Sequence, residues 1–306
     1  MHLRSDHAVR DLPILHTFIQ KHPLGVLTTS LPSENHPTLQ CSHIPWVLDS
    51  QVSDLPIANE ADAQPQSLGI LRGHIARQNP QGKAIVEASE STKTSSIPGA
   101  FPTDETPPST PETIGHTLPE EVLIVFTSPV DHYITPNFYT ESKPATGRVA
   151  PTWNYAAVQV YGRATIYHDT KDPETEIFLR QQLGDLAKLG EEGIMGFQKD
   201  SGSGSGSQTG SMDSGDGVNQ GDGASSSGTA SPTPWKIADA PREYIAALLK
   251  NIVGMRIEIT RIEGRFKVSQ EKGVGDRGGV VKGLEGMGLT TARGMAEFVR
   301  RGRVLP

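Results

Sequence analysis

The sequence is poor in cysteine, in long apolar runs and in basic charge. A single cysteine, Cys41, cannot form an internal disulfide and excludes a zinc site built from several thiolates, which fits a reducing compartment. No apolar run approaches the roughly 20 residues that a membrane helix needs, and the first residues lack the apolar stretch of a signal peptide. We therefore expect a soluble cytoplasmic protein with no membrane segment, although the nucleus stays open as a second compartment.

The balance of charge argues against one class of partner. The 306 residues include 28 basic and 35 acidic side chains, a formal net charge of −7. Nucleic-acid-binding proteins usually concentrate basic charge on one face, so this composition does not support a nucleic-acid partner. Only ARGMAEFVRRGRV, residues 292–304, is locally basic, and a solvated helix face explains it at least as well.

Common catalytic motifs are also missing. The sequence contains no G-x-S-x-G, no G-x-x-x-x-G-K-[ST] and no H-E-x-x-H, and no G-x-G-x-x-G follows a strand. The ten histidines are scattered, and none forms an i, i+4 pair with a third ligand. We expect neither a metal site nor a dinucleotide-binding fold of the usual kind.

Three stretches carry too few apolar side chains to form a core. They span about 50–67, 89–120 and 201–234, and the last is almost entirely Gly, Ser and other polar residues. Such segments cannot bury enough surface to offset the entropy lost on ordering. We interpret them as flexible inserts in one domain spanning 1–306, with phosphorylated or partner-binding segments as the alternative.

The remaining segments predict a mainly β, α+β fold. Strands are expected at 24–30, 38–49, 67–75, 121–128, 152–169 and 255–270, and helices at about 12–22, 172–189 and 244–252, with another after the third strand. Six strands joined mostly by short turns favour a closed or half-closed antiparallel barrel. Pro45 predicts an edge or bulge, Gly162 a bulge or bend, and Glu263-Gly264 a tight hairpin turn.

Polar residues gather at two strand ends. In LRGHIARQNPQGKA, residues 71–84, a strand gives way to a helix whose N-terminal N–H groups and dipole favour an anion such as phosphate. In APTWNYAAVQVYG, residues 150–162, Trp153 and Asn154 offer stacking and edge hydrogen bonds to a flat ligand. The alternatives are structural: surface ion pairs for Arg72 and Arg77, a satisfied His74, and a core anchor at Trp153.

Longer segments resemble a known family. HPLGVLTT (22–29), LRGHIARQNPQ (71–81), GRVAPTWNYAAVQVYGRATI (147–166) and KVSQ (267–270) are similar, in this order, to the PaiB-type family of FMN-binding negative transcriptional regulators. The similarity extends from about residue 9 to 270 outside the inserts. Members of that family resemble pyridoxamine phosphate oxidases, so the resemblance implies a six-stranded antiparallel FMN-binding split barrel with peripheral helices.

The resemblance also implies a homodimer with FMN at the subunit interface. Carried over by motif, the cofactor-binding residues would be Thr28, Thr29, Arg72, Gly73, His74, Arg77, Asn79, Trp153, Asn154, Lys267, Ser269 and Gln270. Two positions depart from the pattern: Gly82 replaces a large aromatic, and Glu271 replaces Asn. A carboxylate at 271 would disfavour a nearby phosphate unless it points away.

Three hypotheses of function remain open at this point. The first is a flavin-dependent oxidoreductase, with a nicotinamide electron donor and with the chemistry supplied by the cofactor, so that no catalytic residue is assigned. The second is a flavin-linked or purely transcriptional regulator without turnover. The third is a haem-binding or haem-degrading split barrel, for which His43, His74 and His132 are the candidate ligands.

Overall fold

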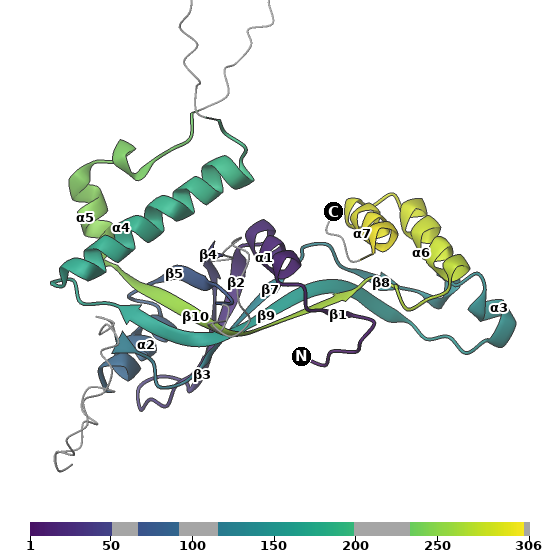
Figure 1. Cartoon of the computed structure of the whole chain (residues 1–306), viewed down its shortest axis with the longest axis horizontal. Coiled ribbons are helices and arrows are strands. Elements are labelled where there is room, and N and C mark those ends of the chain that lie inside the picture. The colour runs from purple at the N-terminus through teal and green to yellow at the C-terminus, as the bar shows by residue number, and fades with distance from the viewer. Residues whose placement is uncertain (51–66, 92–115, 199–232, 303–306) are drawn as a thin grey trace, which may run out of the picture.

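The computed structural model describes residues 1–50, 67–91, 116–198 and 233–302 (Figure 1). Most of the three predicted inserts lies outside these residues. Their edges do not: residues 89–91 end helix α2 (Pro80–Ser91), and β6 (His116–Thr117) forms inside the predicted second insert. In the described part of the chain, no helix is long and apolar enough to cross a bilayer.

An antiparallel sheet curls into a half-barrel and carries the fold. Along its main path the strands run β3-β2-β7-β9-β10-β5-β4. Their bounds are β2 (Leu24–Ser30), β3 (Leu39–Pro45), β4 (Val47–Asp49), β5 (Ile70–Ala76), β7 (Val122–Thr127), β9 (Thr152–Tyr167) and β10 (Ile252–Lys267). Three short strands, β1 (Ala8–Val9), β6 and β8 (His132–Ile134), pair with β9 or β10. The expected α+β fold with a mainly antiparallel sheet is confirmed.

The sheet is closed by one segment that occupies both of its ends. β3 and β4 are consecutive, separated only by Trp46, yet β3 pairs with β2 at one end of the path and β4 pairs with β5 at the other. The break falls just after Pro45, which has no N–H to donate to a ladder. The six predicted strands therefore correspond to six stretches of the chain. One of them, the predicted strand at 38–49, is divided here into β3 and β4.

Side chains that point inward from the strands fill the barrel interior. Trp46, Leu71, Phe126 and Phe266 are almost fully buried, and α1 (Leu12–Lys21) adds Phe18. α1 begins as predicted, because the carboxylate of Asp11 accepts from the N–H of Ile14 at 3.0 Å.

Two helices cover one outer face of the sheet near the ends of β5, β9 and β10. α4 (Pro173–Lys188) runs into a π-helical turn, η4 (Leu189–Ile194), and α5 (Arg242–Lys250) follows the short η5 (Ile237–Asp239). Leu179 packs with Ile245 and Leu249 between the helices. Phe178 stacks on Tyr167 of β9 at 3.9 Å, which fixes α4 to the sheet.

At the far end of the long β9–β10 ribbon lies a second lobe, separated from α4 and α5 by the barrel (Figure 1). It contains η3 (Pro136–Phe138), α3 (Ser142–Thr146), α6 (Val274–Gly286) and α7 (Thr290–Arg301). The glycines of α6 allow close packing: a Cβ at Gly283 would lie 2.2 Å from the ring of Phe138. We call η3, α3, α6 and α7 the ribbon-end lobe.

Two local expectations were wrong. β10 has no hairpin turn at Glu263-Gly264 and runs unbroken, because Gly264 is needed for close packing: a Cβ there would lie 2.3 Å from Leu15. The predicted irregularity near Gly162 lies in the opposite strand, as a register shift between Ile259 and Arg261 of β10.

Candidate functional site

Arg72 of β5 lies under α4 and is neutralised by two carboxylates. Its Nε and Nη2 donate to Asp49 at 2.6 and 2.7 Å, and Nη2 lies 2.8 Å from Asp185 of α4. The hydrogen bond to Asp49 raises the pKa of the guanidinium further, against the effect of burial. Arg72 thus forms the ion pairs of the structural alternative, and its charge is already balanced.

The two residues after Arg72 point to opposite sides of β5. Gly73 faces the interior, where a Cβ would lie 2.7 Å from the indole of Trp46, so its small size serves packing. His74 faces α4, and its Nδ1 lies 2.8 Å from Oε1 of Gln182. Burial lowers the pKa of His74, and the hydrogen bond to Gln182 only partly opposes this.

Arg77 joins the ends of neighbouring strands and of a helix. Its Nε donates to the carbonyl of Lys250 at 3.1 Å, and Nη2 donates to the carbonyls of His168 at 2.6 Å and Ile252 at 3.3 Å. None of these acceptors is a carboxylate. The guanidinium therefore keeps its charge while it fixes the ends of β5, β9 and α5.

Asn79 begins α2 and faces the rim of the barrel. Its Oδ1 accepts from the N–H of Gln81 at 2.8 Å, and its Nδ2 donates to Ser42 at 3.3 Å. Gln81 is buried, and its Nε2 donates to Leu27, Thr29 and Gln40, which joins α2 to β2 and β3. The prediction from sequence motifs did not include Gln81. Its place next to Pro80 at the start of a helix was the signal that could have identified it.

Thr28 and Thr29 separate because β2 alternates. Thr29 is buried and contacts Gln81, whereas Thr28 is half-buried on the outer face of the sheet, opposite the exposed Cys41. Only Thr29 therefore shares a face with the α2 junction.

A second polar cluster lies at the other end of the ribbon. The Nδ2 of Asn154 donates to the Oγ of Ser269 at 2.9 Å, and both residues are fully buried. Ser269 has φ of 60°, an unusual backbone for a non-glycine residue. The Oδ1 of Asn154 has no hydrogen-bond partner. Unpaired buried polar atoms beside a strained residue are typical of binding sites.

Lys267, Gln270 and Glu271 complete this cluster. Lys267 donates to Thr152, and burial lowers the pKa of its amine. Gln270 accepts from the N–H of Val268 at 2.7 Å and donates to the carbonyl of Asp6 at 2.8 Å. Glu271 pairs with His7 at 3.2 Å, so the carboxylate that departs from the family pattern has its own partner.

Trp153 presents an exposed ring beside this cluster. The side chain is 51% exposed, and its Nε1 donates to Asp131 at 2.9 Å. Tyr133, itself 44% exposed, lies edge-on to the indole at 6.2 Å. Trp153 is therefore a surface ring held in a defined orientation, and the core-anchor alternative is wrong.

The twelve predicted site residues thus form two groups within one chain. Arg72 pairs in register with Arg256 of β10, and Lys267 lies eleven residues further along the same strand. At about 3.3 Å per residue, the two positions are roughly 36 Å apart. No single FMN molecule reaches both Arg72 and Lys267 in one chain.

The haem hypothesis gains no geometric support. His43 is exposed on β3, the Nδ1 of His132 is 2.7 Å from the carbonyl of Tyr133, and His74 bonds Gln182. These three histidines lie on different elements. Among the described residues no group of three or more His, Cys, Asp or Glu is arranged to hold a metal ion.

Comparisons with known proteins give the family. The family model described as "Putative FMN-binding domain" matches residues 1–261. The chain belongs to this FMN-binding family. Uncharacterized proteins of Aspergillus fumigatus and Emericella nidulans are 43% and 39% identical to it over 98% of this chain, covering 97% and 96% of theirs. FMN is therefore the cofactor of the chain.

Solved structures show weaker likeness. An FAD- and haem-binding protein from Mycobacterium smegmatis is 9% identical, with a TM-score of 0.38 over 85% of this chain and 73% of its own. The flavocytochrome Anf3 from Azotobacter vinelandii is 8% identical, with a TM-score of 0.36 over 87% and 72%.

The donors and acceptors of the two groups fit parts of an FMN molecule. The hydroxyl of Ser42 and the amide of Asn79 at the barrel rim can bond phosphate oxygens, and Lys267 at the ribbon end is a cation with no carboxylate ion pair among the described residues. The unpaired Oδ1 of Asn154 can accept from a flavin ring N–H. Arg72 does not fit, because two carboxylates already use its charge.

Proposed function

We propose that the protein is a homodimeric, PaiB-type flavoprotein that acts as an FMN-dependent oxidoreductase. The observation that carries this proposal is the match to the FMN-binding family over residues 1–261. When bound, FMN would supply hydride acceptance and donation. The chain's own residues would then bind the cofactor, orient it and limit the access of water.

The separation of the two polar groups supports a site shared between subunits. Ser42 of the rim pairs with Leu27, and through Ile124 the register leads to Val160 of β9, seven residues from Trp153. At about 3.3 Å per residue this is roughly 23 Å along the strands, in addition to the width of the strands between them. One flavin would therefore use both groups when they come from different copies. In this arrangement the ribbon end of one subunit, with Trp153 and Lys267, lies against the barrel rim of the other, with Ser42 and Asn79.

The outer face of β2, β3 and β7 is suited to receive a second copy. Val26, Thr28 and Val125 are half-buried there, and Leu39 is 69% exposed. Apolar side chains in adjacent registers of one sheet face are common in subunit interfaces.

Roles of the chain's residues follow from their chemistry. Trp153 would cover one face of the isoalloxazine ring, and Asn154 would accept from the ring edge, with its orientation set by Ser269. Lys267, whose amine is half-buried, would place a positive charge beside the cofactor. A positive charge close to a flavin favours its reduced, anionic state.

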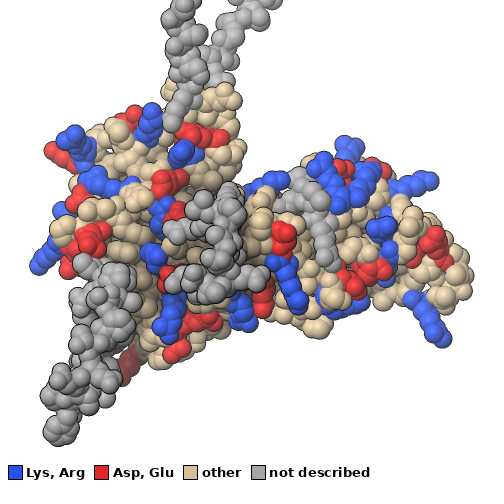
Figure 2. Space-filling view, viewed as in Figure 1, with Lys and Arg blue, Asp and Glu red and all other residues tan. Residues whose placement is uncertain are grey.

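Charge on the surface favours the enzyme over a DNA-binding regulator. Basic and acidic groups are interleaved on the face shown in Figure 2. Two of the three arginines of the locally basic C-terminal helix α7 are paired: Arg300 with Glu285 and Glu297, and Arg301 with Glu297 at 2.6 Å.

The absorption spectrum of the purified protein tests the proposal. Spectra are recorded before and after FMN is added, and then after NADPH is added with no other reductase. Bleaching of the flavin bands by NADPH supports the oxidoreductase with a nicotinamide donor. Flavin bands that NADPH leaves unchanged would favour the regulator, and retention of no FMN would overturn the proposal.

A further inference from the structure

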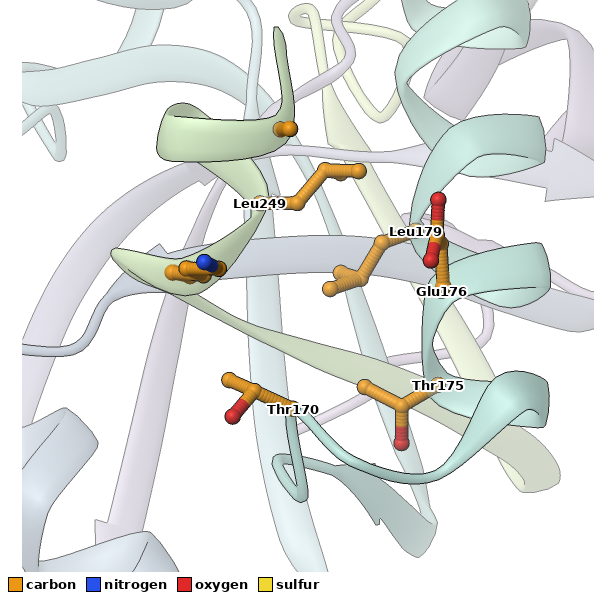
Figure 3. Close-up of a pocket in the computed structure, with 7 residues that line it drawn as sticks. Thr170, Thr175, Glu176, Leu179 and Leu249 are labelled. Carbon is orange, nitrogen blue, oxygen red and sulfur yellow. The ribbon is translucent and has the colours of Figure 1, made fainter. Parts of the chain in front are cut away.

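A small pocket lies between α4 and α5 (Figure 3). These two helices lie on the side of the barrel away from the ribbon-end lobe (Figure 1). Leu179 and Leu249 point into the pocket from the two helices, and Thr170 and Thr175 lie at one end. Its volume is about 80 Å³. This space has room for a few methyl-sized groups and is lined mainly by carbon, so it favours a short apolar chain.

The pocket borders a larger polar cleft. Thr170 and Lys250 line both, and Arg77 and His168 line the cleft, which has a volume of about 680 Å³. That volume lies within the roughly 300–1,000 Å³ that small-molecule sites occupy. Together the two spaces have an apolar end and a polar end, joined at Lys250.

The positive charges in this region lack carboxylate partners. Neither Arg77 nor Lys250 forms an ion pair with a described residue, since Arg77 donates only to carbonyl groups. Two histidines add donors: His116 packs against His168 with ring centroids 4.9 Å apart, and His168 is buried.

Three carboxylates line the two spaces: Glu90 and Asp169 the cleft, and Glu176 the pocket. Glu176 binds Arg180 at 2.7 Å, and Asp169 accepts from the N–H of Lys171 at 2.9 Å. Glu90 lies 3.9 Å from the Nδ1 of His168, at the limit of an ion pair. Each of these carboxylates has a partner, whereas Arg77 and Lys250 have no carboxylate partner among the described residues, so these two cations are the groups that would meet an anionic ligand.

We propose that this pocket and cleft form one binding site for a short-chain organic acid. The carboxylate would bind Lys250 and the remaining N–H groups of Arg77, and the apolar tail would lie between Leu179 and Leu249. The site is separate from the flavin site proposed above, although the family resemblance assigns Arg77 to the flavin phosphate. The experiment must therefore distinguish the two.

A titration with isovalerate tests the site. The full chain, with FMN and without it, carries ¹³C-labelled leucine methyl groups, and isovalerate is compared with acetate and with 3-methylbutan-1-ol. We expect saturable shifts of the Leu179 and Leu249 methyl signals with isovalerate in both forms. Acetate lacks the tail and the alcohol lacks the charge, so both should bind at least tenfold more weakly.

Matched variants assign the charge. Lys250→Met should raise the dissociation constant for isovalerate about tenfold, because a charge-assisted contact is lost. Lys171→Met removes an exposed lysine that lines neither space and should change nothing. Equal binding of the alcohol, or no effect of Lys250→Met, would overturn the proposal. Displacement of isovalerate by FMN would also overturn the proposal, since the cleft would then hold the flavin phosphate. Retention of the flavin by the protein is measured separately, from its absorption.

Discussion

The two polar groups of this molecule have opposite characters. Around Arg72 of β5 the charges are balanced, since Asp49 and Asp185 hold its guanidinium. At the ribbon end, Asn154 keeps an unpaired oxygen, and Ser269 adopts a left-handed backbone. The first arrangement satisfies charge, whereas the second combines an unpaired acceptor with a strained backbone, a pairing that a ligand can use.

The largest expected effect concerns the balanced charges. Arg72→Met should lower the free energy of unfolding by about 3 kcal/mol, because Asp49 and Asp185 lose their shared cation. Urea denaturation measures this, and Arg256→Met, which removes a weaker pair at 3.9 Å, serves as the control with a loss below about 1 kcal/mol. If Arg72→Met instead leaves stability unchanged and abolishes FMN binding, Arg72 binds the cofactor and its assignment to a structural role is wrong.

Packing of the ribbon-end lobe gives the next effect. Gly283→Leu should destabilise the protein by about 2 kcal/mol, because the new side chain meets the ring of Phe138. Gly278 lies in the same helix, and a Cβ there would have no neighbour within 4 Å, so Gly278→Ala should stabilise by roughly 0.5–1 kcal/mol. Thermal unfolding of both variants measures the difference, and a shift of the same sign in both would contradict it.

Mixed dimers sharpen the comparison at the flavin site. Trp153→Ala and Asn79→Ala should each weaken FMN binding about tenfold, a cost of about 1.4 kcal/mol, if each side chain contacts the cofactor. When the two variants are unfolded together and refolded, half of the subunits should be in mixed dimers that hold one intact site. Fluorescence titration of the mixture should then recover a tight-binding fraction. No recovery would place both residues on one subunit's site.

The smallest effect is a dependence on pH. The folded pKa of His74 lies below its ordinary value, so the unfolded chain binds the proton more readily. Stability contributed by neutral His74 is present above pH 6.5 and declines as the pH falls towards the folded pKa, by at most about 1.4 kcal/mol per unit. His74→Gln should reduce the change in the free energy of unfolding with pH between about 6.5 and 5, as measured by denaturation at each pH. An unchanged slope would exclude His74 as the source.

Much of the fold was predictable because periodicity and caps are local signals. The six strand stretches and the starts of α1 and α4 follow from alternation and from Asp11 and Asp172. The unbroken course of β10 through Gly264 was not predictable. Glycine is required there because of the close contact with Leu15, which is about 250 residues away in the sequence. A hairpin signal and a close-packing signal look alike in the sequence.

For the site, residue types were predictable and their partners were not. The pairing of Arg72 with Asp185 depends on how α4 crosses β5, and the sequence places these residues more than a hundred positions apart. Thr28 and Thr29 appear as a pair in the sequence, but strand alternation separates them. The assignment of the twelve residues to FMN remains a prediction.

The pairing of β1 with β10 has a consequence for synthesis on the ribosome. Ala8 lies opposite Arg265, so the first strand to emerge finds its partner only after more than 250 further residues have been added. At about 5–20 residues per second, the N-terminal elements wait for tens of seconds without their neighbour. Chaperones that shield the apolar face of α1 during that interval would therefore be expected to raise the yield of folded protein.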